Sequence, residues 1–291
     1  MDERTTNAIF CDLNERALIR VSGADAREFL QGQLSNDTQL VSPDQCQWTS
    51  LNTPQGRTLA LMRLFELDGD LMLALPTALQ APVIDRLRKY ILRSRVTLEP
   101  ADELTVRCGV AGESAAAALE AAGVKPPASV NGATVTTGVA VIQVNSAAGS
   151  RFELYGPGET AAAIRDALAA HCDASDDSSW LLYDTLAEVP HLGPATSGEF
   201  LPQMLNLDRL GAINFRKGCY AGQEIIARVH YRGQVKRRLK LIVGRDSAAP
   251  GESLVLADGA SATVVQSAPH PGGGFALLAV APVESTDKEE A

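Results

Sequence analysis

The expected secondary structure of this chain changes in kind at about residue 234, and this change constrains the fold more than any other feature. Upstream, helix-like and strand-like segments alternate, whereas downstream only short strand-like segments follow. These strands are expected at 235–243, 253–257, 260–266 and 275–280. We therefore predict a separate C-terminal unit over 234–283, a small β-barrel, followed by a disordered tail over 284–291.

A second unit is predicted over residues 101–175. Its segments follow the order strand, helix, strand, strand, helix, which is most of a ferredoxin-like unit. They are expected at 104–110, 114–122, 139–144, 151–155 and 159–170. Residues 1–100 and 176–233 then form one discontinuous α+β domain. A chain of 291 residues has room for this division, because it exceeds an ordinary domain.

The clearest local signal in the first domain is a β-hairpin. Two apolar runs, 57–67 and 70–75, flank the dipeptide Asp68-Gly69. This dipeptide favours the tight turn of a hairpin, because both of its residues tolerate positive φ. The predicted fold class of the whole chain is α+β.

Charge and composition narrow the functional classes. The net charge is −9, which argues against a general nucleic-acid-coating role. No run approaches the roughly 18–20 apolar residues of a membrane span. The first residues, Met1 to Asn7, are polar, with no apolar signal core behind them. We therefore expect a cytoplasmic monomer without a membrane partner.

Cysteine spacing excludes two further classes of site. The five cysteines lie at least 35 residues apart, which excludes a CxxC redox pair and local zinc-finger ligands. The four histidines are scattered, so no metal site is predicted. The cysteines are Cys11, Cys46, Cys108, Cys172 and Cys219.

One of these cysteines, Cys219, lies between two glycines in a basic segment. Arg216 and Lys217 precede it, and Gly222 opens a predicted helix. Positive charge and a helix N-terminus stabilise a thiolate, the form in which cysteine acts as nucleophile or ligand. Cys219 is therefore the candidate catalytic residue. The alternative is a small buried residue, as most lone cysteines are.

The surroundings of Cys219 form a positive segment in an acidic protein. Residues 208–240 contain nine basic residues and two acidic ones, a local net charge of +7. A solvated face is the ordinary explanation for such charges. The functional alternatives are a site for an anionic ligand and contact of 228–240 with an RNA backbone.

Trp180 is the second candidate site residue. It follows a polar break over 173–179 and opens a predicted helix that ends near Leu186, with Ser178 or Ser179 as the cap. An aromatic ring at this position could stack on a flat heterocycle, and the alternative is an anchor to the core.

The segment around Cys219 carries a family resemblance. Lys217-Gly218-Cys219-Tyr220-x-Gly222-Gln223-Glu224 resembles the signature of the YgfZ family, folate-binding proteins that support iron–sulfur cluster assembly or repair. Flanking segments agree in order and spacing over residues 15–245 or so. They include Gly23-Ala24-Asp25, Gln31-Gly32-Gln33, Asn52 to Arg57, Thr196 to Gln203 and Asn206-Leu207. The family is related to the T-protein aminomethyltransferase of glycine cleavage, so the resemblance implies a three-domain ring around a channel for tetrahydrofolate.

The resemblance also implies site residues. Cys219 matches the cysteine that the family uses functionally, and Trp180 falls on a tryptophan that flanks folate in bacterial relatives. A second folate-flanking tryptophan falls on Arg16, whose guanidinium could stack or pair with a glutamate tail. The expected cofactor-binding residues are Trp180, Arg16, Lys217, Tyr220, Gln223, Glu224 and Arg228.

Comparison with the T-protein class implies that this chain does not catalyse the aminomethyl transfer of that enzyme. That enzyme keeps an aspartate essential to transfer in the strand after the glycine turn, where this chain has Leu59 to Met62 and no carboxylate. The T-protein's folate-contacting glutamate falls on Leu186, with Glu188 two residues away.

The principal hypothesis is therefore a tetrahydrofolate-binding accessory protein that supports assembly or repair of iron–sulfur enzymes, including tRNA-modifying ones. Its partners would be folate and iron–sulfur enzymes or assembly proteins. One alternative is a one-carbon transferase of the T-protein class, which needs an acid or base beside folate. The other is a non-catalytic RNA- or protein-binding module that uses 228–240. The transferase would take its acid or base from Asp12, Asp37, Asp184 or Glu188.

Overall fold

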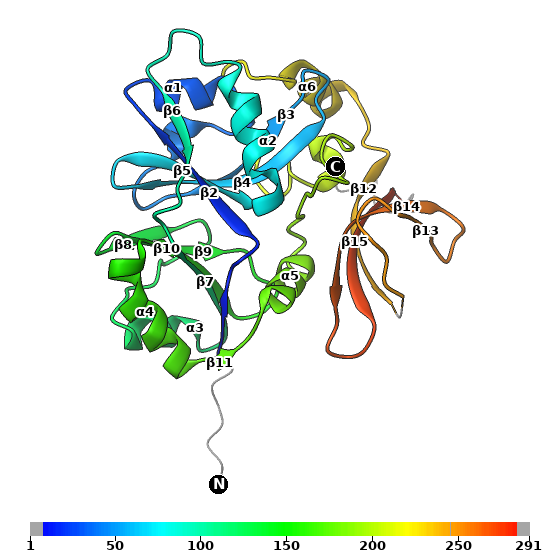
Figure 1. The fold of residues 1–291 in the computed structure, drawn as a ribbon. Coiled ribbons are helices and arrows are strands. Elements are labelled where there is room, and N and C mark those ends of the chain that lie inside the picture. The colour runs from blue at the N-terminus through cyan, green and yellow to red at the C-terminus, as the bar shows by residue number, and fades with distance from the viewer. Residues whose placement is uncertain (1–7, 245, 284–291) are drawn as a thin grey trace.

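The fold is built on three β-sheets connected by short helices and loops (Figure 1). A computed structural model of the protein describes residues 8–244 and 246–283. The tail predicted over 284–291 lies outside the described residues. The mixture of antiparallel sheets and helices confirms the predicted α+β class.

A five-stranded sheet forms the first unit, in the order β3-β4-β5-β2-β6. The predicted hairpin is confirmed: β4 and β5 pair across Asp68 and Gly69, whose φ angles of 54° and 86° are the positive values that a tight hairpin turn requires. The helix α2 packs on β2 and β5. The elements are β2 (Arg16–Ser22), α1 (Ala26–Gln31), η1 (Thr38–Leu40), β3 (Gln47–Asn52), β4 (Thr58–Leu67), β5 (Asp70–Pro76), α2 (Thr77–Arg88) and β6 (Thr97–Pro100).

A six-stranded sheet, in the order β11-β1-β7-β10-β9-β8, forms the second unit. The predicted strand and helix order is present, with β8 as an additional strand. The first strand, β1, pairs with β7 along its full length, so the N-terminal strand lies in this sheet, although the predicted boundary assigned 1–100 to the other domain. Strand pairing of this kind joins distant segments and leaves no local signal. The elements are β1 (Ala8–Asp12), β7 (Val106–Gly112), α3 (Ala115–Ala121), β8 (Ala133–Thr136), β9 (Val139–Val144), β10 (Ser150–Gly156), α4 (Gly158–His171) and β11 (Asp173–Ala174).

The C-terminal unit is an antiparallel sheet of four strands. Its strands lie close to their predicted positions: β12 (Arg237–Gly244), β13 (Ser253–Val255), β14 (Ser261–Pro269) and β15 (Phe275–Pro282). Within the described residues, β12 and β13 are the two edges of the order β12-β15-β14-β13 and do not pair with each other. The sheet is therefore open, and the predicted closed barrel is not confirmed.

Three further elements connect the sheets: α5 (Asp177–Leu186), η2 (Pro202–Leu205) and α6 (Gln223–Arg232). Figure 1 shows α5 between the six-stranded and C-terminal sheets, and α5 contacts β14 and β1. Its cap is Asp176, which accepts a hydrogen bond from the backbone N–H of Ser179 at 3.0 Å. The cap predicted at Ser178 or Ser179 is therefore wrong, because the helix begins three residues before Trp180.

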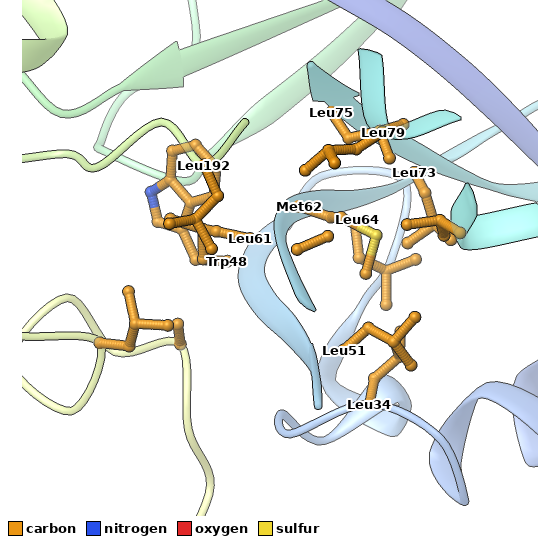
Figure 2. Packing of buried hydrophobic residues seen from close by; sticks show 14 of the residues in the cluster. Leu34, Trp48, Leu51, Leu61, Met62, Leu64, Leu73, Leu75, Leu79 and Leu192 are labelled. Carbon is orange, nitrogen blue, oxygen red and sulfur yellow. The ribbon is translucent and has the colours of Figure 1, made fainter. Parts of the chain in front are cut away.

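The largest hydrophobic core lies on the five-stranded sheet and extends to α6 and the C-terminal sheet. It includes Ile226 of α6 and Leu278 and Val280 of β15, so the C-terminal sheet packs on the same core. Figure 2 shows part of this cluster, with Leu34 beside Leu51, the residues of an isolated β-bridge. No helix in the described part of the chain has the length and apolar character that crossing a bilayer requires.

Candidate functional site

A cavity of about 410 Å³ is lined by elements that belong to or adjoin all three sheets. This volume is in the range of small-molecule sites. The C-terminal sheet joins the site through Gln266 of β14, whose side chain accepts from the backbone N–H of His191 and donates to Thr185 Oγ1 at 2.9 Å. The polar and aromatic lining residues are Glu15, Arg16, Asp177, Ser178, Trp180, His191, Gln266 and Ser267.

Trp180 lines this cavity and is also anchored in the protein interior. Only 2% of its surface is exposed, and the guanidinium carbon of Arg151 lies 4.3 Å from its ring centroid. A Cβ at Gly109 would lie 2.5 Å from the indole, so the absence of a side chain there makes room for the ring. The indole Nε1–H is buried and has no hydrogen-bond partner among the described residues.

Arg16 lines the same cavity and is held by buried carboxylates. Its Nη2 donates to Asp184 Oδ2 at 2.9 Å and lies 3.5 Å from Glu153 Oε1. Arg16 is 6% exposed, so these carboxylates provide the charge compensation that a buried cation requires. The ion pairs fix the position of Arg16 before any ligand binds.

Asp184 is the centre of this buried charge cluster. It also accepts from Arg151 Nη2 at 2.8 Å and lies 2.6 Å from His191 Nε2. Burial by itself would raise the pKa of this carboxyl, but Arg151, His191 and Arg16 hold the pKa well below its usual range. Asp184 is therefore a fixed anion, unsuited to carrying a proton in catalysis.

His191 adds a neutral imidazole to the cavity wall. Burial and the adjacent Arg16 lower the pKa of His191 below its ordinary value of 6.5, against the opposing influence of Asp184. Its Nε2 lies 2.9 Å from Arg16 Nη2. A neutral ring can take part in hydrogen bonds as donor or acceptor without adding charge to the site.

The cluster extends inward to a second carboxylate. Glu153 is 2% exposed, accepts from the Tyr155 hydroxyl at 2.9 Å and lies 3.5 Å from Arg63 Nε. Sequence reasoning did not identify Glu153, Arg151, Arg63 or the ion pairs of Asp184. The partners come from separate strands and from α5, and Arg16 and Asp184 lie 168 residues apart, so no local pattern marks them.

The cysteine motif lies in a different environment. Cys219 is exposed, so the alternative prediction of a buried cysteine is wrong. Lys217 is buried instead, and its ammonium donates to the backbone carbonyls of Gln31, Leu34 and Asn36 at 2.6, 2.6 and 3.0 Å. Burial lowers the pKa of Lys217 to about 8, while three carbonyl acceptors favour its ammonium form. This lysine therefore connects the motif to the segment after α1.

The rest of the motif packs mainly on the protein itself. Tyr220 is buried in the main core, and burial raises its pKa. The Nε2 of Gln223 donates to the Lys217 carbonyl at 3.4 Å. Gly222 has φ +81°, and a Cβ there would collide with the carbonyl of Thr53, so this position needs glycine. The motif thus forms a loop fixed against the turn that precedes β4.

The structure brings two of the predicted cofactor-binding residues together and leaves five apart. Arg16 and Trp180 line the cavity. The others line none of it, and Glu224 and Arg228 are exposed on α6 without a hydrogen bond or ion pair within the described residues. The five are Lys217, Tyr220, Gln223, Glu224 and Arg228. The basic segment therefore does not supply the wall of this cavity.

The carboxylates suggested for a transferase also lie outside the cavity wall. Asp12 pairs with Arg165 at 2.6 Å, and Glu188 is exposed. Two other carboxylates, Glu15 and Asp177, do line the cavity, and sequence reasoning did not identify them. No group of His, Cys, Asp or Glu side chains in the described chain could hold a metal ion. The suggested carboxylates were Asp12, Asp37, Asp184 and Glu188.

Comparison with known proteins gives consistent matches in sequence and fold. The tRNA-modifying protein YgfZ of Escherichia coli O157:H7 is 35% identical over 247 residues, which cover 84% of this chain and 75% of that protein. The protein of the same name from Escherichia coli K12 matches to the same extent. No family model matches. The aminomethyltransferase T of the glycine cleavage system from Bartonella henselae has a similar fold, with a TM-score of 0.76 at 18% identity, over 95% of this chain and 79% of that one.

Proposed function

Because this chain belongs to the YgfZ family, we propose that it binds tetrahydrofolate or another reduced folate and supports assembly or repair of iron–sulfur enzymes, including ones that modify tRNA. The relatives are named tRNA-modifying proteins, and the fold is that of a glycine-cleavage aminomethyltransferase. Strands of two sheets and segments that adjoin the third line one cavity, which supports the ring arrangement that the family resemblance implies.

One observation carries the folate proposal: Arg16 and Trp180, distant in sequence, line the same cavity. These are the two positions at which the family resemblance places folate-flanking side chains. The residues present fit such a ligand, because the wall offers an indole and a guanidinium already held by carboxylates.

Fluorescence titration with tetrahydrofolate tests this proposal. Wild-type protein should show saturable quenching at sub-millimolar ligand, because the ligand covers Trp180. The Trp180→Phe variant should lose most of the quenching and bind more weakly in calorimetry.

The chain contains a matched control for this experiment. Trp48 is the other tryptophan, is also buried, and also lies under a guanidinium, with Arg63 3.9 Å from its ring centroid. It does not line the cavity. Trp48→Phe should retain the quenching, and wild-type protein that shows no saturable binding would contradict the proposal.

We propose a separate role for the exposed thiol of Cys219. It lines no part of the cavity, so its reaction partner would be a macromolecule or a solvent-borne ligand reaching the surface of the motif loop. A protein partner, such as an iron–sulfur enzyme or assembly factor, can reach an exposed cysteine directly.

A transferase of the T-protein class is the less supported function. Transfer needs a proton carrier within hydrogen-bond reach of the substrate. The stretch Leu59 to Met62, where the T-protein class keeps its aspartate, has no carboxylate, and Asp184 is held as an anion by its three partners. The carboxylates that line the cavity, Glu15 and Asp177, lie at other positions in the chain than that aspartate. We therefore expect no aminomethyl transfer to tetrahydrofolate in an assay with the purified protein, and measurable transfer would favour the alternative.

A further inference from the structure

A second hollow, of about 430 Å³, lies beside the C-terminal half of α6 and shares no lining residue with the first cavity. Its wall combines aromatic and cationic side chains. Phe215, Arg216, His230 and Tyr231 are among them, together with Asn214. The function proposed above uses none of these residues.

The aromatic rings of this hollow form a corner. Phe215 and His230 stack with ring centroids 3.7 Å apart and planes 10° from parallel. The Tyr231 ring stands at 74° to His230, with centroids 4.7 Å apart. Tyr231 is 65% exposed, which is unusual for a large aromatic side chain that contributes nothing to the core. A flat ring entering this corner would meet the face of one aromatic side chain and the edge of another.

Cations without partners surround the corner. Arg216 lines the hollow and is exposed, and Arg228 and Arg232 are exposed on α6. In the described part of the chain none of these three has an ion pair or hydrogen bond from its side chain. Glu224 is the one carboxylate on this helix. The local charge is therefore positive in a protein whose net charge is negative.

Other cations of the same basic segment are already engaged. Arg238 forms a two-point ion pair with Asp208, with both N–O distances 3.0 Å. Arg237 donates to the backbone of Val280 at 2.8 Å. Because Asp208 neutralises Arg238, β12 carries less free positive charge than the sequence suggests.

We infer that this surface binds a single-stranded polynucleotide. An exposed base stacks on Tyr231 within the corner, and the flanking phosphates contact Arg216 and Arg232. Proteins usually bind single strands with aromatic rings beside unpaired cations. Every base has a face that can stack on a ring, and every phosphodiester linkage carries a negative charge. A duplex offers phosphates but no free base face, and a run of acidic residues such as poly-glutamate offers charge but no flat ring. RNA and DNA share the recognised chemistry.

Fluorescence anisotropy with a labelled oligouridylate of about 12 nucleotides tests this inference. Tyr231→Ala should raise the Kd by about 5- to 100-fold, because the stacked base loses its platform. Arg216→Gln and Arg232→Gln should each reduce the slope of log K against log salt by about 0.7. The matching deoxyoligonucleotide distinguishes RNA from DNA through its relative Kd.

The matched control is Tyr90→Ala. Tyr90 is also a surface tyrosine, 39% exposed, with the Arg86 guanidinium 5.1 Å from its ring centroid. It lies after α2, far along the chain from α6, and its replacement should leave the Kd unchanged. Tetrahydrofolate titration of the Tyr231→Ala variant should match that of wild type, which separates failure of this inference from failure of the folate proposal.

Three results would overturn the inference. One is a Kd that Tyr231→Ala does not change. Another is equal affinity for a duplex of the same length. The third is a poly-glutamate peptide that binds as tightly as the oligonucleotide, which would identify a surface that recognises charge alone.

Discussion

The cavity and the cysteine motif both contain buried cations, but they stabilise them in different ways. Beside the cavity, Arg16 and Arg151 both pair with Asp184, and Arg16 also lies near Glu153. In the motif, the ammonium of Lys217 donates to three neutral carbonyls, and among the described residues it forms no ion pair. The first arrangement fixes a charged wall for a ligand, whereas the second fixes the course of a loop.

The part of this protein that is recognisable in the sequence is therefore not the part whose shape suits a ligand. The motif is conspicuous in the sequence, yet most of its side chains hold the backbone and leave one thiol, Cys219, exposed. The cavity has no local motif, yet it has the volume and the aromatic wall that suit a small molecule. The three predictions below test this contrast, beginning with the largest expected effect.

Removing the charge of Asp184 should have the largest effect on stability. Asp184→Asn keeps the shape of the side chain but leaves Arg16 and Arg151 without their main anion. We expect the free energy of unfolding to fall by about 3–5 kcal/mol, because an uncompensated buried charge is costly. Urea denaturation measures this change.

The control for this prediction is Asp177→Asn in the first turn of the same helix. Asp177 accepts from Asn14 Nδ2 at 3.1 Å near the surface, so its replacement should cost below about 1 kcal/mol. Measuring the free energy of unfolding at low pH provides a second check of the Asp184 prediction. The pKa of Asp184 is lower in the folded than in the unfolded chain, so its stabilisation is present above pH 3.8 and is lost as pH falls below that value. The difference between wild type and Asp184→Asn should therefore shrink in acid.

Lys217→Met should have an intermediate effect. The change leaves three buried carbonyls without a donor, although it also removes a buried charge. We expect a loss of about 1–3 kcal/mol in the same measurement. Arg216→Met is the matched neighbour, exposed and outside this set of bonds, and should change stability by less than about 0.5 kcal/mol. Equal losses for the two variants would contradict the structural role of Lys217.

Cys219→Ala should have the smallest effect on the fold and a decisive one on function. Stability should change by less than about 0.5 kcal/mol, because the thiol is exposed. In a strain that lacks its own YgfZ relative, the variant should fail to restore growth. Full rescue by the variant would remove the proposed role of the thiol.

Thiol titration of the native protein supplies the control for that variant. Cys11 and Cys108 are buried, and burial raises the pKa of Cys11 to about 12, so these thiols should react slowly. One fast-reacting thiol is expected in wild type and none in Cys219→Ala. A fast phase that persists in the variant would place the reactive cysteine elsewhere.

Some parts of the fold followed directly from local chemistry. The hairpin of β4 and β5 required only the residues Asp68-Gly69 between two apolar runs, and the four C-terminal strands followed from short apolar segments between turns. The assignment of β1 required knowledge of its partner β7, which lies about 100 residues along the chain. Local chemistry therefore gave no indication that this strand joins the six-stranded sheet.

The site shows the same division. Family resemblance pointed to Arg16 and Trp180, and the structure brings them together. It did not point to His191 or Glu153, because their importance depends on neighbours from other strands. The family resemblance predicted that Lys217 binds a ligand. Its three carbonyl acceptors could not be predicted, because nothing in the sequence indicates that these distant carbonyls surround it.

The sequence by itself determined the α+β class, most strands and helices, and the family, because periodicity, turn chemistry and a compact motif act over a few residues. Only the tertiary structure decided that Cys219 is exposed, that Lys217 is buried and that Arg16 shares a cavity with Trp180. Burial and ion pairing are properties of segments brought together from distant parts of the chain, so their consequences appear only when the chain is folded.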